Sequence, residues 1–408
     1  MQDKKITAPR IESLDLLRGL ALMFIILFHA SIYNFANINK IDFSNPPIIV
    51  VLMSFMALWG GIFIIYSMIV NAIMALRRTE GGFGRRIFSD LALTGIVLLF
   101  FHYILNIFLG RWSNDFINNR PNMTVVADSL RNMHLALPRS ANFFEGSSIS
   151  TIAFNLIILS VVMFYMFRGD GLKKEKRNYL ILWFSGFLVM VLSFVRVNIF
   201  PVLAGSAAAG NYLMASFFSF FIANPYPLLP YLAYGIFGLM IGIMIFSGRK
   251  KLLKTIIVPT GIFFIIFGLA GMTNFEKTIS TPDYFWYFKT NFELGIFLLL
   301  TASAYLLAEG KRGFAKNLSL VRWFSRVTLS IYLLETLLSE ILRIILFKFS
   351  PDWNQTINGC LAFGMVNVII WSAIVFFWRK SNFKYSLEYY WVLLSDKAGK
   401  RSTKLDNL

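Results

Sequence analysis

The side chains best suited to chemistry in this chain lie inside long apolar stretches. Arg18 and His29 are found in SLDLLRGLALMFIILFHA, His102 in LLFFHYILNIF and Glu335 in SIYLLETLLSEILRI. An ionisable group inside a membrane-spanning segment costs about 2.5–3.5 kcal/mol on insertion scales, so each of these residues is a candidate functional residue. An imidazole can act as a general base, and a guanidinium group can hold an anion through charge-assisted hydrogen bonds.

The spacing of Arg18 and His29 is informative. In an α-helix the eleven-residue step between them is three turns plus about 20°, so both side chains project from nearly the same face. Their separation along the axis is about 16 Å, which would place Arg18 near the inner headgroups and His29 in the outer half of the bilayer. A structural alternative stays open, in which Arg18 reaches lipid phosphate and His29 hydrogen-bonds a neighbouring helix.

Other polar groups allow both a structural and a chemical interpretation. His102 and Asn106 are one helical turn apart and indicate either an interhelical hydrogen bond or part of a site. Glu340 and Arg343, at i and i+3, are expected to neutralise one another. Glu335 either pairs with a cation on another helix, is protonated because it is buried, or takes part in the reaction. In each case it is expected to face the protein interior. Arg196 and Glu293 lie near outer helix ends, and they are expected to reach the membrane surface, with a functional role as the alternative.

The elements that must position these residues are membrane-spanning helices. The chain has 408 residues, of which 57% are hydrophobic and only 15% charged, whereas about a quarter of the residues in a soluble domain are charged. Roughly 20 mainly apolar residues span a bilayer, and about ten segments approach that length. The sequence therefore predicts an all-α, polytopic integral membrane protein with about ten transmembrane helices. They lie near residues 14–36, 48–75, 87–109, 149–167, 179–200, 228–247, 252–272, 291–308, 324–347 and 357–378.

The distribution of basic residues predicts the orientation of the chain. The formal net charge is +18, and most of the 39 Lys and Arg residues fall in alternate connecting segments. Cytoplasmic loops of membrane proteins are enriched in Lys and Arg, so both termini are predicted to be cytoplasmic. The alternation requires that residues 201–227, interrupted by Pro and Gly, do not cross; they are expected to form an outer re-entrant or interfacial element. The basicity thus indicates contact with the lipid bilayer and not with nucleic acid.

The remaining features bound the domains and the cofactors. Residues 1–378 are interpreted as the membrane domain, and residues 379–408 as a cytoplasmic interfacial helix followed by a basic tail. A single cysteine, Cys360, excludes an internal disulfide. The three histidines are not accompanied by carboxylates at metal-ligand spacing, so no metal is expected.

The first apolar segment, RIESLDLLRGLALMFIILFHA, resembles the first helix of the transmembrane acyltransferase superfamily. That superfamily includes bacterial membrane O-acyltransferases and heparan-α-glucosaminide N-acetyltransferase-like proteins. Its first helix carries an Arg, ten residues and then a His, matched here by Arg18 and His29. RRIFSDLALTGIVLLFFHY is similar to a third helix that begins with two Arg and carries a His. RWFSRVTLSIYLLE is similar to a late S-x-x-IYLLH stretch, with Glu335 where His is common.

The resemblance implies acyl transfer from cytosolic acyl-CoA, most simply acetyl-CoA, to an extracytoplasmic acceptor such as a glycan or another small molecule. His29 would act as general base, with His102 and Glu335 as further catalytic candidates. Outer loop 110–147 and strip 201–227 would bind the acceptor. A transporter or flippase that uses the same buried polar residues as a translocation path is the alternative, and a homodimer is compatible with either. The residues implied to hold the coenzyme phosphates are Arg18, Arg85, Arg86, Arg322 and Arg326.

Overall fold

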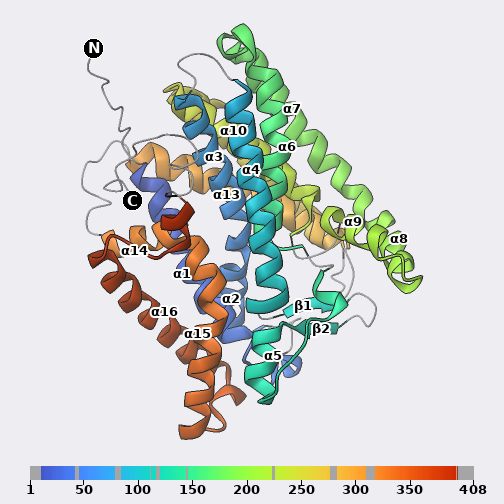
Figure 1. Cartoon of the computed structure of the whole chain (residues 1–408). Coiled ribbons are helices and arrows are strands. Elements are labelled where there is room, and N and C mark those ends of the chain that lie inside the picture. Colours follow the sequence, from blue (N-terminus) through green and yellow to red (C-terminus); the bar gives the residue numbers. More distant parts are fainter. Residues whose placement is uncertain are drawn as a thin grey trace. The chain divides into compact units, whose positions relative to one another are not determined.

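The computed structural model describes residues 11–41, 46–78, 84–110, 112–115, 120–143, 146–222, 226–275, 283–308, 318–391 and 393. Helices make up nearly all of the regular structure (Figure 1). They are α1 (Glu12–Ile32), α2 (Ile48–Leu58), α3 (Ile62–Arg77), α4 (Arg85–Ile104), α5 (Val125–Asn132), α6 (Ser148–Phe167), α7 (Glu175–Leu192), α8 (Arg196–Ala208), α9 (Tyr212–Ile222), α10 (Leu228–Phe246), α11 (Lys250–Leu252), α12 (Val258–Met272), α13 (Tyr284–Ala308), α14 (Ser319–Phe324), α15 (Thr328–Phe349) and α16 (Ile357–Lys380).

The segment between α4 and α6 contains the strands found in the described residues. β1 (Trp112–Asp115) and β2 (Arg120–Met123) pair antiparallel, with Trp112 opposite Met123. Thr124 follows β2 and its hydroxyl donates to the carbonyl of Gly110, which closes this loop before α5 begins. Apart from this short hairpin the described chain is helical, so the predicted all-α fold class is confirmed.

In the described part of the chain, nine helical stretches are long and apolar enough to cross a membrane, and the protein is therefore a multi-pass membrane protein. All nine overlap predicted segments. The second begins only at Trp59, because a 3-10 turn separates α2 from α3. The stretches are 12–32, 59–77, 85–109, 148–167, 175–208, 228–246, 250–272, 284–307 and 357–380.

The predicted segment 324–347 differs from the others. It corresponds mainly to α15, whose 22 residues equal the length needed to span. Its middle carries Glu335, Glu340 and Arg343, so it is more charged than the other nine stretches. The predicted helix is therefore present, but α15 is not among the stretches that are apolar enough to cross a membrane.

The described part of strip 201–227 is mainly helical, because α8 continues to Ala208 and α9 covers Tyr212–Ile222. α8 continues from α7 through a 3-10 turn, so the helical stretch runs to Ala208 and exceeds the predicted span of 179–200. Gly210, at φ +70°, adopts a left-handed conformation that reverses the chain into α9. α9 has 11 residues, about half the length of a spanning helix, in agreement with the prediction that the strip does not cross.

The chain divides into two compact units that do not follow its linear order. The first unit comprises 1–57, 301–332 and 353–408, and the second comprises 58–300 and 333–352. In the first, α1 packs against α14 and α16. Gly19 is required there, because a Cβ at this position would lie 1.8 Å from the carbonyl oxygen of Val321. In the second, α4 packs along α6, and the buried helix α10 packs against α3, α6 and α7.

Candidate functional site

Arg18 contacts the turn that joins α14 to α15 within the first unit. Its Nε donates to Thr328 Oγ1 at 3.1 Å, and its Nη2 donates to the carbonyl of Ser325. Asp15, one turn earlier on α1, accepts a hydrogen bond of 2.8 Å from Ser325 Oγ. A 3-10 turn at Ser325–Val327 interrupts the α-helical hydrogen bonding, and carbonyls at such helix ends need other donors. Arg18 therefore has a structural role that its position in the sequence does not indicate.

Two other predicted coenzyme-binding residues belong to the same unit. Arg322 pairs with Glu12 through Nη1 at 2.9 Å. Its Nε is buried and makes no hydrogen bond within the described part of the chain. The guanidinium group of Arg326 lies 5.8 Å from the ring of Phe383. The unit thus brings together Arg18, Arg322 and Arg326, whereas Arg85 and Arg86 belong to the second unit and are exposed at the start of α4.

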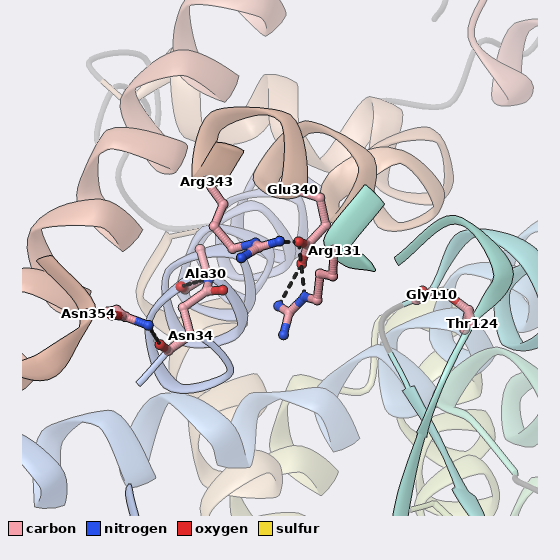
Figure 2. A network of polar contacts seen from close by, with 8 residues as sticks. All are labelled: Ala30, Asn34, Gly110, Thr124, Arg131, Glu340, Arg343 and Asn354. Atoms are coloured by element: carbon pink, nitrogen blue, oxygen red, sulfur yellow. Dashed lines mark hydrogen bonds and ion pairs between the residues drawn. The ribbon is translucent and has the colours of Figure 1, made fainter. Parts of the chain in front are cut away.

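His29 lies on the same helix as Arg18, as predicted. The imidazole is half-buried and stacks on the ring of Tyr33, with centroids 5.1 Å apart and planes inclined by 28°. Beyond the end of α1, Asn34 Nδ2 donates to the carbonyl of Ala30 at 2.8 Å, and Asn354 Nδ2 donates to the carbonyl of Asn34 at 3.0 Å (Figure 2). These bonds fix the chain next to His29 and leave its ring accessible in part.

His102 is fully buried in the second unit. Its Nδ1 lies 2.8 Å from the hydroxyl oxygen of Ser147, the N-cap residue of α6. The interhelical hydrogen bond considered for His102 is therefore present. Asn106 lies one turn further on, and its backbone carbonyl accepts a hydrogen bond of 3.0 Å from Asn142 Nδ2.

Glu335 and Glu340 are both buried on α15. Glu335 is 7% exposed, which confirms that it faces the protein interior. Glu340 accepts from Arg343 Nε at 2.6 Å, so the pair predicted from their spacing is confirmed. It also accepts from Arg131 of α5, from Nε at 3.0 Å and from Nη2 at 2.7 Å (Figure 2). Two guanidinium groups thus neutralise one buried carboxylate, and Arg131 links α5 to α15.

Arg196 and Glu293 do not reach the membrane surface, so that expectation is wrong. They are 2% and 3% exposed, respectively. The guanidinium carbon of Arg196 lies 3.6 Å from the ring centroid of Trp286, and its Nε donates to the carbonyl of Ile222. Glu293 pairs with Lys289 at 3.1 Å and accepts a hydrogen bond from Tyr231. Nearby aromatic rings and internal hydrogen bonds satisfy these charges, which removes the need for water.

Glu388, which follows α16 near the C-terminus, contacts the first turn of α15 at the α14–α15 junction. Glu388 accepts hydrogen bonds from the backbone N–H groups of Leu329 at 2.6 Å and Ser330 at 3.2 Å, and from Ser330 Oγ at 2.5 Å. Leu329 and Ser330 are in the first turn of α15, where N–H groups lack acceptors within the helix. Neither the junction nor Glu388 was singled out by the sequence, because the residues involved are far apart along the chain.

Neither a scan against models of known protein families nor a search of characterised proteins found a match for this chain. The fold defines a class, the polytopic α-helical membrane proteins. No group of three or more His, Cys, Asp or Glu side chains that could hold a metal ion occurs among the described residues. A particular activity must therefore be argued from the side chains described above.

Proposed function

We propose that this protein is a membrane acyltransferase that moves an acyl group, most simply acetyl, from cytosolic acyl-CoA to an extracytoplasmic acceptor. The observation that carries the proposal is α1, one helix that bears Arg18 and His29 on nearly the same face about 16 Å apart. The cell membrane is the proposed location. The acceptor would be a sugar hydroxyl or amine.

The coenzyme end of the site would be the α14–α15 junction of the first unit, where Arg18, Arg322 and Arg326 lie. Phosphate groups bind guanidinium groups through strong charge-assisted hydrogen bonds. Arg322 is well suited to this role, because its side chain is 22% exposed and its buried Nε has donor capacity left among the described contacts. Arg18 and Arg326 would add positive charge within the same unit.

The reactive end would be His29. The imidazole would take a proton from the acceptor while the acceptor oxygen or nitrogen attacks the thioester carbonyl; the C–S bond then breaks and the thiolate takes up the proton. Stacking on Tyr33 limits rotation of the ring, which favours one orientation for proton transfer. His102 and Glu335 are the further catalytic candidates.

One observation supports the transporter or flippase alternative. Arg196, Lys289 and Glu293 form contacts inside the second unit, and charged groups within membrane proteins often mark translocation paths. Their burial against Trp286 and Tyr231 gives them a structural explanation as well. The acyltransferase proposal has the advantage that the spacing of Arg18 and His29 suits both ends of an extended coenzyme.

Incubation of the detergent-purified protein with acetyl-CoA tests the proposal. Release of free coenzyme A that rises when candidate acceptors are added, together with acylated acceptor in the products, is the expected result. A well-folded protein that neither binds nor consumes acetyl-CoA would favour the transporter. Substrate-dependent flux in vesicles without any acyl donor would support that alternative directly.

The proposed orientation has its own test. Single cysteines at Ser113, Ser216 and Ser402, in a Cys360→Ser background, are treated with a membrane-impermeant thiol reagent. The distribution of basic residues predicts labelling from outside at position 113 and none at position 402 until the membrane is permeabilised. External labelling at position 402 would reverse the orientation and place Arg18 on the wrong side for cytosolic coenzyme.

A further inference from the structure

Ser147 in the second unit is held as a nucleophile would be. It precedes α6 and forms a capping box with Ser150: its Oγ accepts from the Ser150 N–H at 3.4 Å, and its own N–H donates to Ser150 Oγ at 2.9 Å. These reciprocal bonds restrict the side chain of Ser147. They also place its hydroxyl at the positive end of a 20-residue helix, where developing negative charge is stabilised.

His102 supplies a base at the right distance. Its Nδ1 lies 2.8 Å from Ser147 Oγ, within the range of an activated nucleophile and its base. The imidazole is held by aromatic neighbours, with ring centroids 5.0 Å from Tyr103 and 5.6 Å from Phe220. The rings beside the pair, among them Phe154 at 5.2 Å from Phe220, make its surroundings apolar.

The other ring nitrogen of His102 is not explained by a purely structural role. Nε2 is buried and has no hydrogen-bond partner within the described residues. A buried polar atom left unsatisfied costs about 1–3 kcal/mol. A side chain needed only to join α4 to α6 would avoid this cost if it carried a single polar group. A second ring nitrogen is useful where the imidazole has to carry a positive charge for part of a reaction.

The proposed chemistry requires one tautomer of His102. Ser147 Oγ can accept from the Ser150 N–H and still donate its own proton to His102 Nδ1, in which case the neutral imidazole carries its proton on Nε2. Nδ1 is then a lone-pair acceptor. This is the tautomer that a base for a serine hydroxyl requires.

We propose that Ser147 and His102 form a serine–histidine pair that accepts the acyl group of an ester or thioester. Ser147 Oγ attacks the carbonyl carbon and its proton passes to His102 Nδ1. The bond from the carbonyl carbon to the leaving oxygen or sulfur then breaks, and Nδ1 returns the proton to the departing alcohol or thiol. Attack by water or an acceptor hydroxyl on the serine ester, with the proton transfers reversed, restores Ser147.

This inference adds a covalent intermediate to acyl transfer, and it rests on the proposed function only for the identity of the acyl donor. It requires neither the coenzyme nor His29. Failure of acetyl-CoA turnover and failure of the Ser147–His102 pair are therefore separate results.

An alkyl fluorophosphonate, which phosphonylates activated serines, tests the pair on the purified full-length protein. We expect labelling at Ser147, located by peptide mass spectrometry, and slow hydrolysis of p-nitrophenyl acetate. His102→Asn keeps a hydrogen-bonding group near the Nδ1 position but removes the base, and should slow labelling by about 10²-fold or more. Ser147→Asn preserves a favourable N-cap and should abolish labelling.

The controls separate chemistry from folding. Ser160→Ala removes another buried serine of α6, one that donates to the carbonyl of Ile157 at 2.7 Å, and should label like the wild type. A folded wild type that is not labelled at Ser147, or a His102→Asn variant labelled at the wild-type rate, would overturn the proposal. Because the first outcome is read on the wild type, it does not depend on any variant folding.

Discussion

The two units satisfy their charged groups in different ways. At the junction of the first unit, Arg18 binds a backbone carbonyl and a hydroxyl, and Arg322 keeps 22% of its side chain exposed. In the second unit Glu340 is fully buried between two arginines, and Arg196 is buried against Trp286. The partner of Arg322, Glu12, is 50% exposed, so Arg322 can exchange it for a ligand phosphate. The fully buried Glu340 cannot be exchanged in this way without opening the packing. We therefore expect changes at the junction to affect binding most, and changes at the buried pairs to affect stability most.

Glu340→Ala should have the largest effect on stability. It leaves Arg131 and Arg343 positively charged with their carboxylate removed, and breaking a buried pair in this way costs about 3–5 kcal/mol. The apparent melting temperature in detergent is the measurement. Asp170→Ala is the control, because its pair with Lys173 is formed by side chains that are 77% and 82% exposed. Equal melting temperatures for the two variants would contradict the stabilising role of the buried Glu340 pairs.

Arg196→Met should have a smaller effect on stability. It keeps much of the apolar stem and loses the contacts of the guanidinium group with Trp286 and the carbonyl of Ile222. We expect the free energy of unfolding to fall by about 1–3 kcal/mol. The loss is limited because the variant no longer has to bury a charge, which offsets part of the lost interactions. Binding of acetyl-CoA, measured under conditions in which the variant is fully folded, should be unchanged. A selective loss of coenzyme binding in this variant would move the coenzyme site into the second unit.

Glu388 should give the smallest effect, a dependence of stability on pH. Burial raises the pKa of the Glu388 carboxyl, and the hydrogen bonds from Ser330 and Leu329 offset this only in part. A carboxyl with a raised pKa takes up a proton on folding. It therefore stabilises the folded state at low pH, and that contribution is lost as the pH rises through the pKa of the folded protein.

The wild type should accordingly lose melting temperature relative to Glu388→Gln as the pH is raised from about 4 to 7. Glu175→Gln is a suitable control, because its partner Arg249 lies on the surface and Glu175 belongs to a different unit. Parallel pH profiles for the wild type and Glu388→Gln would show that Glu388 does not titrate at the junction.

The sequence predicted those features that depend on neighbouring residues. Long apolar runs predicted the spanning helices, and helical spacing predicted the pair Glu340–Arg343 and the shared helix of Arg18 and His29. Contacts between distant segments were not predictable in this way. Arg131 meets Glu340 across 209 residues, because packing and not periodicity brings α5 to α15.

The same limit explains two features of the candidate site that the sequence did not reveal. The bonds of Arg18 to Ser325 and Thr328, which lie far away along the chain, could not be foreseen. Arg196 was expected to reach the membrane surface, because its position near a helix end gave no sign of Trp286 lying over it. Hydropathy indicates that a charge in a span needs neighbours, but it does not identify them.

The most direct test compares Arg18→Ala and His29→Ala for binding of acetyl-CoA by calorimetry and for acyl transfer on the same purified proteins. Arg18→Ala should weaken coenzyme binding by about 1.5–3 kcal/mol, because a charge-assisted contact to phosphate is lost. His29→Ala should bind normally while turnover falls by about 10²–10⁴-fold. Arg249→Ala, which removes an exposed positive charge from the second unit, is the control and should leave both values unchanged. Full turnover in a folded His29→Ala variant would contradict the proposed role of His29 and leave α1 without a reactive group.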